Sequence, residues 1–152
     1  MSKIILGMLL LSVALLIFIS GCTQKLIIKT GTSFGECNGY CKEELTITQD
    51  NIVYIKSGWD NSLQEIREEV EISDETWNSL SNALDKDKFE SLQEIIGCPD
   101  CADGGAEWIE IDDGFLNKRV TFEYGASIPD IDNLVKELRD IRESVSSKFK
   151  EQ

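Results

Sequence analysis

The stretch from Ile131 to Val145 reads IDNLVKELRDIRESV and carries the strongest periodic signal in the chain. Its apolar residues recur at helical spacing, at positions 131, 134, 135, 138, 141 and 145. This pattern predicts a helix of about four turns with one apolar face. Pro129 stands where such a helix begins, because proline is tolerated in the first turn. A helix of this kind has to bury its apolar stripe against another layer of the protein.

The residues before this helix alternate like strands. Lys118 to Tyr124 is the clearest case, with Val120, Phe122 and Tyr124 in one phase and polar residues in the other. Ala106 to Asp112 alternates in the same way, and a turn follows at Asp113-Gly114. These features predict a β-hairpin over residues 106–124.

The N-terminal half predicts further strands. Glu44–Thr48 and Ile52–Lys56 flank a polar turn and form a second predicted hairpin. Leu26–Lys29 is rich in β-formers and predicts the start of a first strand, before a glycine-rich loop that begins at Gly31. Ile66–Ile72 alternates imperfectly and predicts a short edge strand.

Two helical stripes lie between the predicted hairpins. Ser73 is a good N-cap for a helix whose apolar residues are Trp77, Leu80 and Leu84. A second short stripe, with Asp87 as its expected cap, contains Phe89, Leu92, Ile95 and Ile96. Strands and helices do not alternate as βαβ units, so the fold class predicted is α+β. We expect an antiparallel sheet of two hairpins plus an N-terminal strand, with the helices packed on one face, in a single domain over residues 26–152.

The N-terminus has the composition of a secretory signal. Lys3 is the only charged residue among the first 24, and the run Ile4–Ile19 is almost wholly apolar. A helix that spans a bilayer needs ~20 apolar residues, and this run is shorter than that. The run ends at Ile19-Ser20-Gly21-Cys22, which resembles the prokaryotic lipobox: an aliphatic residue, two small residues and a cysteine.

The lipobox resemblance implies cleavage before Cys22 and attachment of diacylglycerol to its sulfur. Residues 1–21 would then be a lipoprotein signal peptide, and residues 22–25 the lipidated cysteine and a short tether. Two or three acyl chains such as palmitate hold a protein stably on a bilayer, whereas one chain does not. The alternative is an uncleaved signal anchor. Both predict a protein at the cell membrane that faces the periplasm or the cell exterior.

Charge limits the partners of the exported domain. The chain has 15 basic and 28 acidic residues, and loss of Lys3 takes the formal net charge from −13 to −14. Such a surface repels phosphate backbones, which argues against nucleic-acid binding. The chain contains no histidine, so the usual neutral-pH acid–base group is missing, as is the commonest metal ligand.

Four cysteines remain after Cys22, in two close pairs: Cys37 with Cys41, and Cys98 with Cys101. An even number in an exported domain indicates disulfides, formed within each pair or across the two. Cross-loop pairing would close a long loop and would stabilise the fold most, by ~4 kcal/mol. A four-thiolate zinc site is an alternative, since both spacings suit tetrahedral zinc. A thiol-disulfide oxidoreductase that uses Cys98 and Cys101 is another, although no helix is predicted to start at Cys98.

Other candidates for a site are weaker. Several carboxylates lie in or near the second cysteine loop, namely Asp100, Asp103, Glu107, Asp112 and Asp113, and we expect them to be solvated rather than to bind calcium. Trp59 lies in a polar loop and is the tryptophan expected to contact a partner. Trp108 is out of phase with Ile109 and Ile111, which predicts that it lies on the opposite face of the sheet. No nucleotide-binding or nucleophile motif is present.

Three segments resemble a family of uncharacterised prokaryotic lipoproteins with paired-cysteine loops. They are the loop from Ser33 to Cys41 followed by Leu45-Thr46-Ile47, the segment Gly97–Trp108, and Val120–Gly125. The resemblance covers roughly residues 26–145, implies a domain of unknown function, and carries over no catalytic residue. The leading hypothesis is a non-enzymatic, lipid-anchored binding module stabilised by disulfides, held to the membrane through Cys22 and with an unknown protein or small-ligand partner.

Overall fold

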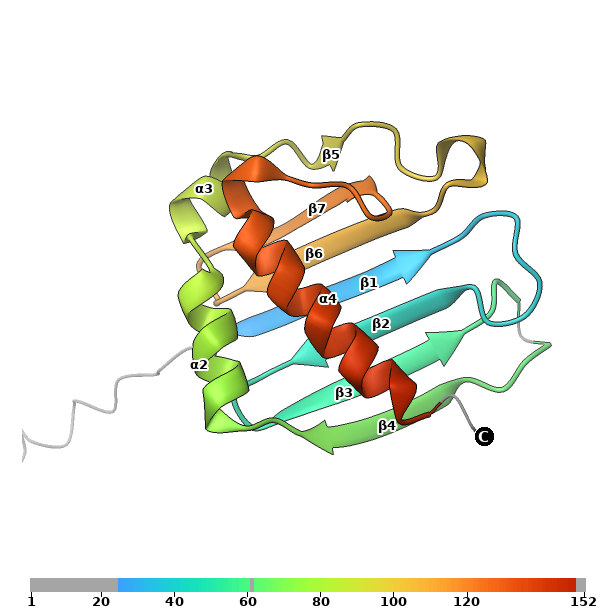
Figure 1. The fold of residues 1–152 in the computed structure, drawn as a ribbon, viewed down its shortest axis with the longest axis horizontal. Coiled ribbons are helices and arrows are strands. Elements are labelled where there is room, and N and C mark those ends of the chain that lie inside the picture. Colours follow the sequence, from blue (N-terminus) through green and yellow to red (C-terminus); the bar gives the residue numbers. More distant parts are fainter. Residues whose placement is uncertain (1–24, 61, 150–152) are drawn as a thin grey trace, which may run out of the picture.

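The computed structural model describes residues 25–60 and 62–149. These residues form one seven-stranded sheet in the order β4-β3-β2-β1-β6-β7-β5 (Figure 1). The strands are β1 (Ile27–Ser33), β2 (Lys42–Ile47), β3 (Asn51–Ser57), β4 (Ile66–Glu71), β5 (Ile95–Ile96), β6 (Ala106–Asp112) and β7 (Asn117–Glu123). All neighbours pair antiparallel except β5, which pairs parallel to β7.

Helices cover one face of this sheet. They are α2 (Asp74–Ala83), α3 (Lys86–Ser91) and α4 (Asp132–Ser147), with the 3-10 turns η2 (Cys101–Asp103) and η3 (Pro129–Ile131). Figure 1 shows α4 running diagonally across the sheet with α2 beside it. The predicted α+β class is therefore confirmed. Within the part of the chain that the structure describes, no helix has both the length and the apolar character needed to cross a bilayer.

Several local predictions were wrong. The predicted sheet of two hairpins, an N-terminal strand and a short edge strand is one strand too small, because the sheet has seven strands. Ile95 and Ile96 form a strand rather than the end of a helix, since the chain turns extended at Leu92 and pairs with β7. The cap of α3 is Asp85, whose side chain accepts from the Lys88 amide, and not Asp87. Gly31 belongs to β1 rather than to a loop, because it pairs with both β2 and β6.

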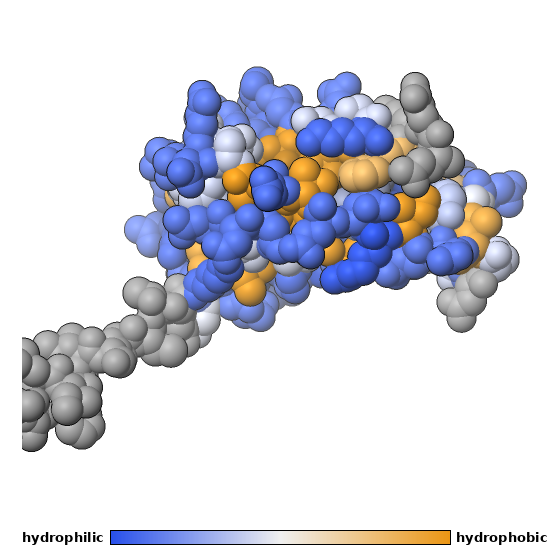
Figure 2. Space-filling model, turned by 90° about the horizontal axis from the view of Figure 1, so that it is seen from below, coloured by the Kyte–Doolittle hydropathy of each residue, from blue (hydrophilic) through white to orange (hydrophobic). Residues whose placement is uncertain are grey.

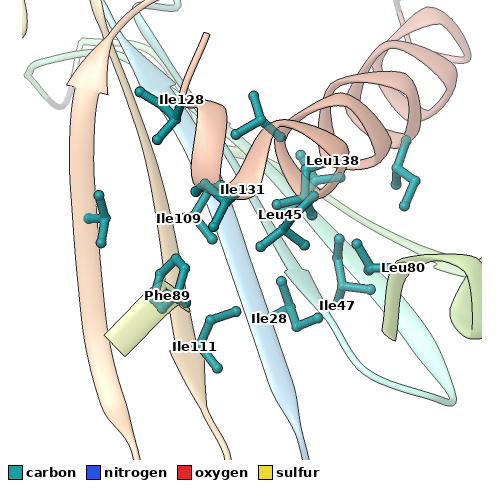
Figure 3. Close-up of a cluster of buried hydrophobic side chains, with 14 of the residues drawn as sticks. Ile28, Leu45, Ile47, Leu80, Phe89, Ile109, Ile111, Ile128, Ile131 and Leu138 are labelled. Carbon is teal, nitrogen blue, oxygen red and sulfur yellow. The ribbon is translucent and has the colours of Figure 1, made fainter. Parts of the chain in front are cut away.

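The core lies between the sheet and the helices. Strand alternation sends every second side chain toward α4, where Ile28, Leu45 and Ile109 are almost fully buried. Leu138 of α4, Leu80 of α2 and Phe89 of α3 pack onto the same layer (Figure 3). A fully buried Leu, Ile or Phe side chain contributes roughly 1.5–3 kcal/mol, so this layer is the main source of stability.

The opposite face of the sheet carries a large aromatic side chain on β6. Trp108 alternates with buried Ile109 and so lies on this second face, as its phase predicts. The register places Trp108 beside Gly31, and a Cβ atom at Gly31 would collide with the indole ring. The guanidinium of Arg119 lies 3.8 Å from the centre of that ring. Gly31 thus allows a tryptophan to lie flat across the neighbouring strand.

The two ends of the sheet differ in what they carry. Ile27 pairs with Asp112 at one end of β1, and Ser33 pairs with Ala106 at the other. We call the first the tether end, since the chain enters β1 there, and the second the loop end, since both cysteine loops adjoin it. In Figure 1 the tether end is on the left and the loop end on the right. The seven residues of β1 separate the ends by roughly 20 Å.

Candidate functional site

Each cysteine loop is closed by its own disulfide. Cys37 is bonded to Cys41 with Cα atoms 5.6 Å apart, and Cys98 to Cys101 with Cα atoms 5.5 Å apart. The prediction of disulfides is confirmed, and of the pairings left open the structure has the local one. Cys22 lies outside the described residues.

The two disulfide loops contact each other at the loop end. The backbone N–H of Gly35 donates to Asp100 Oδ1 at 3.2 Å. The Phe34 ring packs edge-on against Tyr124, with ring centres 5.0 Å apart, and fills the space where a side chain at Gly105 would lie. Gly105 also has a φ of +83°, a conformation that glycine adopts without strain. The loops therefore form one surface from two distant parts of the sequence.

Trp59 is part of this surface. Its side chain is 54% exposed, and its indole N–H donates to the carbonyl of Phe34 at 2.7 Å. The ammonium of Lys42 lies 4.8 Å from the ring centre. One edge of the ring is thus fixed to the Cys37–Cys41 loop, while about half of the side chain faces solvent.

The Cys98–Cys101 pair lacks the setting that activates a catalytic thiol. Both cysteines are exposed, so a partner could reach the disulfide. The following helix, η2, is a single 3-10 turn, and Asp100 before it has a φ of +60°. Dithiol catalysts lower one thiol pKa with the N-terminus of a helix, and this geometry does not supply one.

The described residues do not form a zinc or calcium site. The four sulfurs are paired in disulfides, and no cluster of three or more His, Cys, Asp or Glu side chains in residues 25–60 and 62–149 is placed to hold a metal. Asp100 accepts a hydrogen bond from Gly35, and Asp112 and Asp113 accept bonds within the turn that follows β6. Only Asp103 among these loop acids has no recorded hydrogen bond.

Sequence reasoning missed a buried ion network beneath the loop end. Glu107 is 1% exposed and lies between two arginines of α4. Arg139 donates to both of its carboxylate oxygens, at 3.0 Å and 2.7 Å to Oε2 and 3.2 Å to Oε1. Arg142 donates to Oε1 at 2.7 Å and is itself 8% exposed. Burial would raise the pKa of Glu107, but the hydrogen bonds from Arg139 and the charge of Arg142 outweigh it and hold the pKa below its usual range.

The sequence indicates this network only through the positions of its residues in the strand and helix periodicities. Glu107 was grouped with the loop acids, yet it is in the same strand phase as Ile109 and Ile111 and so faces the helices. Arg142 is one helical turn beyond Leu138 on the buried stripe of α4. Two charged residues inside apolar patterns, Glu107 and Arg142, were the signal that a buried ion pair joins the two elements.

A polar cleft opens above the network. It has a volume of about 480 Å³ and is lined by Glu43, Tyr124, Gly125, Arg139, Arg142, Glu143 and Ser146. A smaller cavity of about 170 Å³ adjoins it and reaches the cysteine loop at Phe34, Tyr40 and Cys41. Glu43, Tyr124 and Arg142 line both. We call the two together the loop-end cleft.

The wall of the cleft opposite α4 is formed by β2 and β3. The Tyr54 hydroxyl donates to Glu43 Oε1 at 3.1 Å, and the Lys56 ammonium lies 3.5 Å from the same oxygen. Burial, together with the charge of Glu43, raises the pKa of Tyr54 above its usual value, so Tyr54 remains a donor. The cleft therefore presents the Glu43 carboxylate and the guanidinium groups of Arg139 and Arg142, each held by fixed partners.

A second hollow lies between α2, α4 and β4. It has a volume of about 510 Å³, an apolar floor that includes Ile72, Ile141 and Val145, and several carboxylates at its rim. Figure 2, seen from below relative to Figure 1, shows apolar residues framed by hydrophilic ones. Among residues 25–60 and 62–149, the buried ion network lies at the loop-end cleft and not at this hollow, so we take the loop-end cleft as the candidate site.

No protein-family model matches the chain, and no curated protein is significantly similar to it in sequence.

Proposed function

We propose that this protein is a lipid-anchored, non-enzymatic binding module that faces the periplasm or the cell exterior. Residues 1–21 act as the signal peptide, and Cys22 carries the lipid that holds the domain at the membrane. The lipobox-like segment Ile19–Cys22 supports this anchor. The acidic surface, with its net charge near −14, excludes nucleic acid as a partner.

The loop-end cleft is the observation that carries the binding role. Its lining includes the guanidinium groups of Arg139 and Arg142, and Cys41 of the first disulfide lines its smaller part. Tyr124, which lines the cleft, and Trp59, which is hydrogen-bonded to Phe34 in its wall, remain about half exposed. Concave sites with a few convergent polar groups and exposed aromatic residues are the usual form of a ligand site. Pre-organised groups also reduce the entropy lost on binding.

The charges of the cleft define the ligand class. The Arg139 side chain is 30% exposed and can donate hydrogen bonds to a ligand carboxylate in addition to those it donates to Glu107. Glu43 and Glu143 line the same cleft and suit a ligand ammonium group. We therefore propose a small zwitterion, such as an amino acid or a short peptide.

A thermal-unfolding screen with free amino acids and dipeptides tests this proposal. A ligand at 100 times its dissociation constant stabilises the folded state by about 2.7 kcal/mol, which raises the melting temperature by several degrees. We expect at least one member of the panel to do so for the unmodified protein. The rise should be lost in Glu143→Gln, which removes a cleft carboxylate.

Glu137→Gln is the matched control, because Glu137 lies on the same helix but lines the hollow beside α2. It should leave the ligand-induced rise unchanged. A panel without any stabilising compound, or an equal rise in Glu143→Gln, would refute the proposed site and ligand class.

A further inference from the structure

Phe115 is exposed to an unusual degree. Its side chain is 94% exposed, the highest value among the exposed large apolar residues that the structure describes. It lies in the turn between β6 and β7, and the neighbouring Leu116 packs against the core.

The turn that carries Phe115 is braced by the two preceding aspartates. Asp112 accepts from the Gly114 N–H at 2.9 Å, and Asp113 accepts from the N–H groups of Phe115 and Leu116 at 3.0 Å and 2.8 Å. Asp113 also forms an ion pair with Lys86 of α3. These contacts hold the carboxylates of Asp112 and Asp113 in place and make the turn rigid. The Phe115 ring therefore projects from an ordered turn and loses little conformational entropy on binding.

The turn lies at the tether end. Ile27 pairs with Asp112, so Phe115 is three residues beyond the strand partner of the first residue of β1. Cys22 precedes Ile27 by five residues, which span at most roughly 18 Å when fully extended. A lipid on Cys22 therefore keeps this turn close to the bilayer surface.

We infer that Phe115 inserts into the lipid interface beside the acylated Cys22 and acts as a second contact that orients the domain. This inference rests on the proposed lipid anchor. A lipid surface is the occupant that fits, because the length of the tether brings the bilayer to this turn. The contact is apolar rather than electrostatic, since the domain carries a net charge near −14 and repels anionic head groups.

The orientation has a consequence for ligand access. With Phe115 at the membrane, the loop end lies at the far end of the sheet, roughly 20 Å away. The loop-end cleft and Trp59 then face away from the bilayer, where an external ligand can reach them.

Tryptophan quenching by brominated lipids tests the inference on the mature, acylated protein. Phe115→Trp adds a fluorophore at the turn, and the protein is reconstituted in phosphatidylcholine vesicles with and without bromine on the acyl chains. Interfacial side chains lie ~5–10 Å below the head groups, so we expect the added emission to fall by about half. Vesicles with added phosphatidylglycerol should not increase this loss, because the acidic domain repels anionic head groups.

Ile95→Trp is the matched control, because Ile95 is 64% exposed and its strand pairs with Thr121 and Phe122 of β7, toward the loop end. Its added emission should not be quenched. If Phe115→Trp is acylated and vesicle-bound but no more quenched than Ile95→Trp, the membrane contact is wrong although the anchor stands. If the unmodified protein is not acylated, the anchor itself fails.

Discussion

At the scale of single residues, Glu107 is a buried carboxylate whose loss should destabilise the fold. A carboxylate that is 1% exposed persists because two guanidinium groups of α4 surround it. Removing one partner of a buried pair is costly, because the remaining charge is left without compensation. The network also ties β6 to α4 at the floor of the loop-end cleft, so the Glu107 carboxylate supports the proposed site without itself contacting the ligand.

Glu107→Gln should lower the free energy of unfolding by about 3 kcal/mol, because it leaves the buried Arg142 and the partly buried Arg139 without this negative partner. Urea unfolding measures this change. Glu110→Gln is the control: it removes a carboxylate from the same strand on the outer face, where Glu110 pairs with Lys29 and Arg119. It should cost under about 1 kcal/mol, as partly exposed pairs do. Equal effects would mean that the network does not stabilise the fold.

The same variant should change the dependence of stability on pH. The pKa of Glu107 is lower in the folded state than the value of about 4.3 in an unfolded chain. Its contribution is therefore complete above that value and is lost as pH falls through the lower folded pKa. Urea midpoints measured below pH ~4.3 should fall less steeply in Glu107→Gln than in the unmodified protein. An unchanged slope would show that Glu107 is not ionised in the folded protein.

At the scale of elements, helices and strands that depend on neighbouring residues were predicted well, and those that depend on partners distant in sequence were not. The stripe of α4, the Ser73 cap of α2 and the alternation of β7 are each determined by neighbouring residues, and all were predicted. β5 was not, because two isoleucines acquire strand geometry only from β7. The Gly31–Ser33 part of β1 was missed for the same reason, since its partners are distant in sequence. The cleft could not be predicted, because it forms where α4 meets two loops.

The disulfide loops give a prediction at this scale. Each bond closes a loop of only a few residues, so loss of either should cost about 2 kcal/mol rather than the ~4 kcal/mol of cross-loop pairing. Urea unfolding of Cys37→Ala/Cys41→Ala and of Cys98→Ser/Cys101→Ser measures these costs. The second variant should reduce insulin at the same rate as the unmodified protein, because no α-helix starts at Cys98. A clear loss of that activity would support the oxidoreductase alternative instead.

At the scale of the whole molecule, the sheet separates two roles. The tether end carries Ile27 and the exposed Phe115, and the loop end carries the disulfides, Trp59 and the cleft above Glu107. A domain anchored at one end presents the other to its surroundings. This division was not predicted, since it depends on the antiparallel register of β1 with β6.

The measurement that tests the central claim most directly is the intact mass of the protein extracted from membranes without reductant and treated with an alkylating agent. We predict a chain that starts at Cys22, carries the mass of diacylglycerol, is four hydrogens lighter than its reduced form and takes up no alkyl group. A chain that retains residues 1–21 without lipid would contradict the anchor. Four alkylated thiols released together with one zinc ion would contradict the disulfide-stabilised binding module.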